Sequence, residues 1–273
     1  MSEKTNTKLI LPKIRGYHGN ISHFHHFFAG YYLPVLFNEP INQDNTLTVL
    51  SCGPMGKIWL NTPKFKFETI NFKCVKFKKF SEKISYFGYD GPGTPGKSFT
   101  HENIHLLKEK IFNIFDIDIN EEPSKKEIII INRGKAPEKN SKKSYGKKRG
   151  AARRTIVNID WLKKDISSYY PVRDVQMEGL SMRDQILLFR DAKAIIADHG
   201  SALSHMVWCS PNTPVFEICP LSHKKKIWFR KMGRMCNLQH KQFINRVFVP
   251  ADALTIKQEL LYCLENNKNF KKT

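Results

Sequence analysis

The chain lacks several features that would place it in a common class of protein. No run of residues approaches the roughly 18 apolar residues of a membrane-spanning helix. The N-terminus lacks the basic-then-apolar layout of a signal peptide, so we expect a soluble, cytoplasmic protein. The six cysteines form no CxxC pair and no zinc-ligand spacing, which predicts buried free thiols.

Acidic residues are few relative to basic ones. The chain has 45 Lys and Arg against 25 Asp and Glu, a formal net charge of +20. Residues 135–154 hold nine of the basic residues and one acid, and their Lys, Ser and Gly content is typical of a flexible, solvated loop. Phosphate binding is a second interpretation. Nucleic-acid binding is a third, but Tyr145 is the single aromatic residue there that could stack on a base.

The second half of the chain alternates apolar strand patterns with helix patterns. We predict strands near 127–132, 173–177, 194–198, 214–218 and 246–249, and helices near 157–169, 181–193, 201–209, 224–235 and 253–266. Such alternation is typical of a parallel, doubly wound sheet with helices on both faces. The sequence therefore predicts an α/β fold with a Rossmann-like C-terminal half.

The first half is less regular but also reads as an α/β unit. We predict helices near 22–37 and 101–115, and strands near 47–51, 57–60, 69–77 and 84–89. The polar segment 116–126 breaks the apolar pattern and contains Pro123, as a linker does. The predicted domains are therefore 1–120 and 121–250, followed by a C-terminal helix at 251–273 that packs back on the N-terminal domain.

Polar residues gather at predicted strand ends in residues 178–220. His199 and Gly200 follow a short buried strand, and Ser201 can cap the next helix. Free backbone N–H groups and a positive helix end would then lie at the carboxyl edge of the sheet, which suits an anionic ligand. Glu217 is a lone carboxylate near the end of another buried strand, which suggests a partner such as a sugar hydroxyl.

Three further polar residues lie near predicted strand ends or helix starts. Arg133 ends an Ile-rich strand and is either a diphosphate clamp or a surface residue. Arg154 follows the basic run just before a helix. Glu178 precedes a helix that Ser181 and Asp184 mark with a capping-box pattern, and it is otherwise a solvated loop carboxylate.

The N-terminal segment 20–34 is rich in histidine and aromatic residues. His23 and His26 are three residues apart and share one face of a helix. An aromatic core helix with polar edge histidines is one interpretation, and a histidine that takes a proton from an acceptor hydroxyl is the other. Zinc binding is disfavoured because no third ligand lies nearby.

A possible phosphate-binding loop occupies residues 91–98. Their sequence, GPGTPGKS, matches the pattern GxxxxGK[ST]. Pro92 and Pro95 remove two backbone donors from a loop that would have to surround phosphates with N–H groups. We therefore prefer a Gly/Pro surface loop, with a phosphate-loop NTPase as an alternative.

In chain order, these positions resemble the family 61 glycosyltransferases, which include xylosyltransferases and O-linked N-acetylglucosaminyltransferases. The resemblance covers about residues 130–250 well and 18–36 loosely. That family has a strand-end Arg, a second Arg before a helix, a Glu before Leu-Ser, a His-Gly turn and a late strand Glu. The corresponding residues here are Arg133, Arg154 with Asn158, Glu178 with Leu180 and Ser181, His199 with Gly200, and Glu217.

The resemblance implies a GT-B fold, in which two Rossmann-like domains face a cleft. It also implies an inverting transfer from a UDP-sugar, with xylose as the first expectation, to a hydroxyl of a glycan or glycoprotein, without a metal or other cofactor. Arg133, Arg154 and the turn from His199 to Ser201 would neutralise the diphosphate, and Glu217 would hold ribose hydroxyls. The implied candidates for the general base are His23, His26 and Glu178.

The chain departs from the family pattern in two places. Phe27 and Phe28 stand where the family usually has an acidic residue, which leaves the general base open. Ala202 and His205 replace a glycine and an asparagine after the His-Gly pair. With its short length and the expected absence of a membrane anchor, the chain resembles cytosolic or virus-encoded members of the family. A nucleic-acid-binding module using 135–154 and an NTPase using 91–98 are the alternative functions.

Overall fold

The computed structural model describes residues 8–9, 47–50, 65–68, 101–133, 156–246 and 249–270. The chain divides into two compact units, residues 1–121 and 122–273. Some predicted features lie outside the described residues: the helix near 22–37, the strands near 57–60, 69–77 and 84–89, the loop 91–98 and the basic run 135–154.

The first unit contains a small parallel sheet and one helix among the described residues. Its strands are β1 (Lys8–Leu9), β2 (Leu47–Leu50) and β3 (Phe65–Glu68), paired in the order β1-β2-β3. The helix α4 (His101–Ile114) coincides with the range predicted from the sequence. Its apolar residues Ile104, Ile111 and Phe112 are buried, as the helical spacing predicts.

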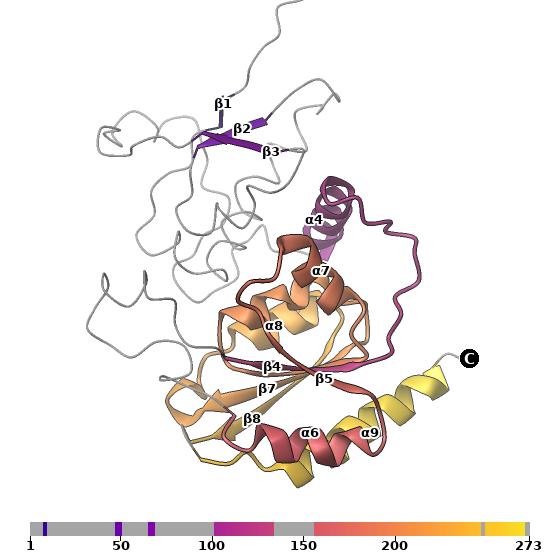
Figure 1. Ribbon diagram of the computed structural model, residues 1–273, viewed down its shortest axis with the longest axis vertical. Helices are drawn as coiled ribbons and strands as arrows, with labels where there is room; N and C mark the ends of the chain where they lie inside the picture. Colours follow the sequence, from indigo (N-terminus) through magenta and orange to yellow (C-terminus); the bar gives the residue numbers. More distant parts are fainter. Residues whose placement is uncertain are drawn as a thin grey trace, which may run out of the picture. The chain divides into compact units, whose positions relative to one another are not determined.

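The second unit is built on a five-stranded, fully parallel sheet (Figure 1). Its strands are β4 (Ile128–Asn132), β5 (Val172–Gln176), β6 (Ala194–Asp198), β7 (Pro214–Pro220) and β8 (Gln239–Asn245), in the order β5-β4-β6-β7-β8. All residues of β6 and β7 are buried, and apart from Asp198 and Glu217 both strands are apolar, as is typical of strands covered on both faces of a sheet. The first four strands lie where the apolar runs predicted them.

The last strand was predicted in the wrong place. The prediction placed it at 246–249, whereas β8 is Gln239–Asn245. β8 is an edge strand, and most of its residues are partly exposed. Its sequence, QHKQFIN, therefore shows no apolar run, while the apolar residues at 247–249 imitate one.

Helices cover both faces of this sheet, as right-handed crossovers require. One face is covered by α6 (Ile159–Ser167) and α9 (Ala253–Phe270), and the other by α7 (Met182–Arg190) and α8 (Trp228–Met235) (Figure 1). A 3₁₀ helix, η5 (Ser201–Trp208), contacts α7 and α8. A second short 3₁₀ helix, η6, spans Leu221–His223. No helix in the described part of the chain is long and apolar enough to cross a membrane.

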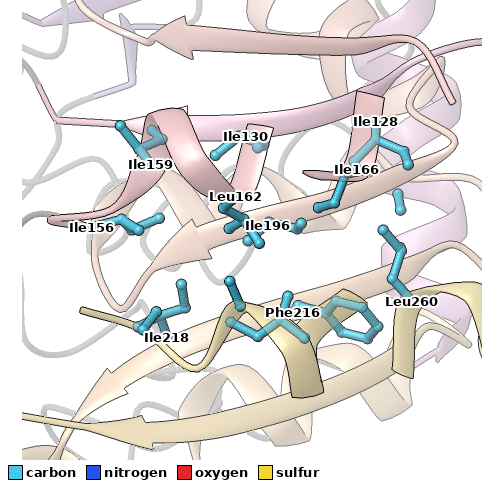
Figure 2. Packing of buried hydrophobic residues seen from close by; sticks show 14 of the residues in the cluster. Ile128, Ile130, Ile156, Ile159, Leu162, Ile166, Ile196, Phe216, Ile218 and Leu260 are labelled. Atoms are coloured by element: carbon cyan, nitrogen blue, oxygen red, sulfur yellow. The ribbon is translucent and has the colours of Figure 1, made fainter. Parts of the chain in front are cut away.

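The main hydrophobic core lies between the sheet and the helices α6 and α9. Ile130, Ile196 and Phe216 point from the strands toward Leu162 of α6 and Leu260 of α9 (Figure 2). All five side chains are fully buried. The C-terminal helix thus packs within the second unit, and the predicted packing of residues 251–273 on the N-terminal domain stays a prediction.

Two local features show why these helices begin where they do. Asn158 bonds the backbone of Ala251 through both side-chain atoms, with Nδ2 donating at 2.9 Å and Oδ1 accepting at 2.8 Å, which ties the start of α6 to the segment before α9. Ser181 caps α7 by accepting a hydrogen bond from the backbone N–H of Asp184 at 3.1 Å, as predicted.

The described cysteines, which are Cys209, Cys219, Cys236 and Cys263, are free and buried, also as predicted.

Candidate functional site

The candidate site lies at the carboxyl edge of the second sheet, between β4 and β6. The chain runs from β4 outward to β5 and then returns to β6 on the other side of β4, so connections diverge at this point. In open α/β sheets such a switch point is where ligands bind. Arg133 follows β4, and His199 follows β6. The guanidinium Nη2 of Arg133 donates a hydrogen bond to the backbone oxygen of His199 at 3.1 Å.

Gly200 provides the space that Arg133 occupies. A Cβ on Gly200 would lie 1.7 Å from Nη2 of Arg133, so any larger residue would displace the guanidinium. The backbone of Gly200 is extended, and its lack of a side chain, not its torsion angle, is what matters. Nε of Arg133 also lies 4.0 Å from the Asp198 carboxylate. Arg133 is therefore held over the turn between β6 and η5, with a fifth of its side chain still exposed.

The helix that follows this turn differs from the predicted one. It is a 3₁₀ helix whose N-cap is Gly200, and no side chain caps it, so the predicted capping by Ser201 is wrong. Ser201 and Ala202 are partly exposed, whereas the residues from Leu203 to Trp208 are buried. The first N–H groups of a helix have no acceptor within the helix. This end therefore offers donors next to Arg133, which together favour an anion.

Strand alternation brings the polar residues to one face of the sheet. Ala197 of β6 pairs with Ile131 of β4 and with Glu217 of β7, so these three residues share a face. Side chains two positions apart point the same way, which places His199 and Arg133 on that face as well. The structure thus brings together Arg133 after β4, His199 after β6 and Glu217 of β7.

Glu217 is fully buried, and both of its carboxylate oxygens are occupied. Oε1 contacts Nδ1 of His199 in a close hydrogen bond. Oε2 lies 3.1 Å from Nε2 of His240 and accepts a hydrogen bond from Nε2 of Gln242 at 3.3 Å. Nε2 of His240 is within ion-pair distance of Oε2, but the contact lacks the geometry of a hydrogen bond. Direct binding of ribose hydroxyls by Glu217 would require one of these contacts to be given up.

The carboxyl of Glu217 stays ionised inside the protein. Burial raises the pKa of this carboxyl, but the contacts with His199 and His240 lower it further than burial raises it, to about 2. A buried charge is tolerated only when partners replace its lost hydration. Glu217 is therefore a fixed negative charge beneath the turn that carries His199.

Aromatic side chains enclose the His199 ring. The ring of Phe229, from α8, meets it edge-on with centroids 5.2 Å apart, and the ring of His223 lies 4.9 Å away. His199 is 8% exposed. Its Nδ1 is held by Glu217, and among the described residues its Nε2 has no hydrogen-bond partner.

Sequence reasoning missed His240 and Gln242, because it placed the last strand at 246–249. The two residues alternate along β8 and face Glu217, which pairs with Gln242 in register. A signal was present in QHKQFIN, where polar residues two apart could have been read as the inner face of an edge strand. Phe229 carried no signal beyond its place in a helical apolar stripe.

Three buried groups near this turn include donor atoms that metals use. His199, Glu217 and Cys219 each place one such atom within 4.8 Å of the others. Nδ1 of His199 is already directed at the Glu217 carboxylate, so a metal would have to separate the two. Sγ of Cys219 lies 3.9 Å from the same nitrogen. The group therefore fits a hydrogen-bonded network better than a set of metal ligands.

The remaining predicted site residues are not joined to this cluster. Glu178 is exposed in the turn after β5, and no hydrogen bond or ion pair of the described residues connects it to Arg133 or His199. His23, His26 and Arg154 lie outside the described residues. The identity of the general base thus stays a prediction.

A separate pocket of about 720 Å³ lies along α7, near the start of β4 and β5. Its lining includes the cations Lys126 and Arg173 together with the carboxylates of Glu127, Asp184 and Asp191. It contains none of the predicted site residues. Its mixed charge does not favour an anion as Arg133 and the start of η5 do.

Comparison with known proteins places the chain in a family. Residues 24–216 match the family described as Glycosyltransferase 61. A β-1,2-xylosyltransferase of Arabidopsis thaliana is 41% identical over 46 residues, which are 17% of this chain and 9% of that protein. A solved lysine decarboxylase, LdcF of Francisella novicida, aligns with 53% of this chain and 18% of its own at 14% identity and a TM-score of 0.32, which has no bearing on function. The match over 24–216 confirms the predicted family: the chain belongs to glycosyltransferase family 61.

Proposed function

We propose that this protein is an inverting glycosyltransferase. It transfers a sugar from a UDP-sugar to a hydroxyl of a glycan or glycoprotein acceptor, without a metal ion. The family match and the similarity to a xylosyltransferase support the reaction class, and the latter supports xylose as the first donor to test. The name of that xylosyltransferase specifies a β-1,2 linkage. Forming a β-linked product from an α-linked nucleotide-sugar inverts the configuration at the anomeric carbon.

The position of Arg133 is the observation that carries this proposal. Its guanidinium lies over the turn between His199 and Gly200, next to the open start of η5 and at the switch point of the sheet. A planar guanidinium and free N–H groups suit a diphosphate, since both donate hydrogen bonds to its oxygens. The donor-binding residues of the proposal are therefore Arg133, His199, Gly200 and Ser201, with Arg154 as a further candidate.

The proposed reaction is a single displacement. A base takes the proton of the acceptor hydroxyl while its oxygen bonds to the anomeric carbon. The bond from that carbon to the diphosphate oxygen breaks, and UDP leaves with the electron pair. Charge develops on the leaving diphosphate, where preorganised donors such as Arg133 and the η5 N–H groups stabilise it without a metal.

The base that takes the acceptor proton is one of three candidates. In the GT-B arrangement that we propose, the second unit binds the nucleotide-sugar and the first unit binds the acceptor. His23 and His26 belong to the first unit, and Glu178 belongs to the second. Replacing each by alanine and measuring turnover at saturating donor would identify the base among them.

The proposal is tested by nucleotide binding and donor hydrolysis. Calorimetric titration with UDP, and hydrolysis assays across a panel of nucleotide-sugars, should show binding and slow release of UDP by the wild-type protein. Arg133→Ala should weaken UDP binding at least about tenfold, because it removes a charged donor pair. Absence of binding to every nucleotide-sugar at millimolar concentration would exclude the proposed function.

Two control variants separate this effect from a loss of charge. Arg173→Ala removes the same charge from an exposed position near the start of β5 and should leave UDP affinity unchanged. Lys97→Ala tests the phosphate-loop alternative and should also have no effect. If Lys97→Ala abolished binding and Arg133→Ala did not, the loop at 91–98 would be the nucleotide site.

A further inference from the structure

The charge of Glu217 is enclosed by protein groups and directed at His199. The side chain is 0% exposed, and its oxygens face His199 on one side and His240 with Gln242 on the other. With these contacts in place, the carboxylate cannot reach a ligand at the switch point. Its effect on a bound nucleotide then has to pass through a neighbour, and His199 is the neighbour that lies at the switch point.

His199 is held from several directions. Its Nδ1 is bonded to Glu217, its backbone oxygen accepts from Arg133, and its ring packs against Phe229. An imidazole has two nitrogens, and a carboxylate that accepts the Nδ1 proton leaves Nε2 as the atom for a ligand. Nothing in the described part of the chain bonds Nε2.

His240 holds Glu217 in turn. Its Nε2 lies 3.1 Å from Oε2, on the side of the carboxylate opposite His199. Gly233 of α8 makes this possible, because a Cβ there would lie 2.7 Å from Cβ of His240. The contacts thus form a chain from α8 through β8 and β7 to the turn after β6.

We propose that Glu217 is a positioning residue that acts through His199, and that His240 fixes Glu217. In the imidazolium form, in which both ring nitrogens carry a proton, Nδ1 of His199 donates to Glu217 and Nε2 donates to an oxygen of the diphosphate of the nucleotide-sugar, beside Arg133. This inference rests on the proposed function and deepens it. It replaces the ribose contact expected from the sequence with an indirect role for Glu217.

A double-mutant cycle tests whether Glu217 acts through His199. UDP affinity is measured for the wild type, His199→Ala, Glu217→Met and the double variant. Each single variant should weaken UDP binding about tenfold or more, and the double variant should bind no more weakly than His199→Ala. Additive losses would overturn the proposal, since Glu217 would then contribute to binding independently of His199.

Conservative variants separate positioning from stability. Glu217→Gln keeps an oxygen that can accept a hydrogen bond from Nδ1 of His199, so it should retain more UDP affinity than Glu217→Met. His240→Phe should weaken UDP binding in the wild type but not in the His199→Ala background. Gln185→Met replaces another buried polar side chain, in α7, and should leave UDP affinity unchanged. An equal loss in Gln185→Met would mean that UDP affinity follows stability, which would also overturn the proposal.

Nitrogen-15 NMR of the histidine rings tests the arrangement without any nucleotide. In the ligand-free protein, Nδ1 of His199 should carry a proton, and its resonance should move in Glu217→Met. An unprotonated Nδ1 in the wild type would overturn the positioning role even if UDP binds. A protonated Nδ1 in a protein that binds no nucleotide-sugar would instead leave the arrangement standing and remove the proposed function.

Discussion

At the scale of single residues, the most unusual group is an ionised carboxylate in the interior. Isolated charges are costly to bury, and the penalty is removed only by partners of opposite or polar character. Glu217 has three such partners from two elements, which are His199, His240 and Gln242. The same contacts that stabilise its charge also determine where His199 lies.

The depressed pKa of Glu217 makes a prediction about pH and stability. An unfolded glutamate has a pKa of about 4.5, whereas burial and the stronger opposing contacts of His199 and His240 leave the folded value at about 2. Stability from this group is therefore complete above about pH 4.5 and is lost as pH falls toward 2. The difference corresponds to roughly 3 kcal/mol. Urea unfolding at a series of pH values should show a shallower acid decline for Glu217→Gln than for the wild type.

The free energy of unfolding as a function of pH, compared between the wild type and Glu217→Gln, shows whether Glu217 is the ionised group. Glu217→Gln should be less stable than the wild type at neutral pH, and the two should approach each other at low pH. Glu265→Gln is a suitable control, because Glu265 is exposed and makes no hydrogen bond or ion pair among the described residues. Parallel curves for wild type and Glu217→Gln would show that Glu217 is not the ionised group.

At the scale of elements, α8 and the edge strand β8 set the geometry of the site through their contacts with His199 and Glu217. α8 is short, and its buried residues are Trp228, Phe229, Met232 and Gly233. Phe229 meets the His199 ring, and Gly233 lies against His240. The helix thus contacts both histidines that flank Glu217, although it supplies no polar group to them.

Gly233→Ala distinguishes close packing from helix propensity. Alanine in place of a helical glycine should stabilise an unstrained helix by about 1 kcal/mol. Here the new Cβ would meet Cβ of His240 at 2.7 Å, so α8 or β8 must shift, and we expect a net loss of about 1–3 kcal/mol. Equilibrium unfolding in urea measures this change.

The matched control for that variant is Lys231→Ala, at an exposed position of the same helix. It should change the free energy of unfolding by less than about 0.5 kcal/mol. A stabilised Gly233→Ala protein would mean that α8 does not hold His240 by close contact.

At the scale of the whole molecule, the charge of +20 favours anionic ligands. A strongly basic protein attracts anions over distances that salt controls. Raising the salt concentration from about 0.1 M to about 1 M shortens the screening length from about 10 Å to about 3 Å. UDP affinity should therefore fall several-fold over this range, as titration calorimetry at each salt concentration would show.

Uridine is the control ligand for this prediction, because it lacks the diphosphate and carries no charge. Its affinity should not fall with salt. A UDP affinity that is independent of salt would show that the short-range contacts of Arg133 and η5, and not the overall charge, account for binding.

The sequence by itself determined the family and most of the second unit. The ordered set from Arg133 to Glu217 identified the family, and the apolar runs of β4, β6 and β7 located the central strands. These features are readable because a strand buried on both faces is apolar along most of its length. The serine cap of α7 is equally local, since it depends on residues three apart.

Only the tertiary structure decided what the polar residues do. Arg133 and His199 are 66 residues apart, and Glu217 meets Gln242 of an edge strand whose sequence has no apolar run. The pairing register of β6, β7 and β8 brings them to one face, and a register is a property of neighbouring strands that neither sequence shows alone. The sequence alone therefore suggested Glu217 as a contact for a sugar hydroxyl, a role that stays a prediction, whereas only the packing shows that it is buried and bonded to His199 and Gln242.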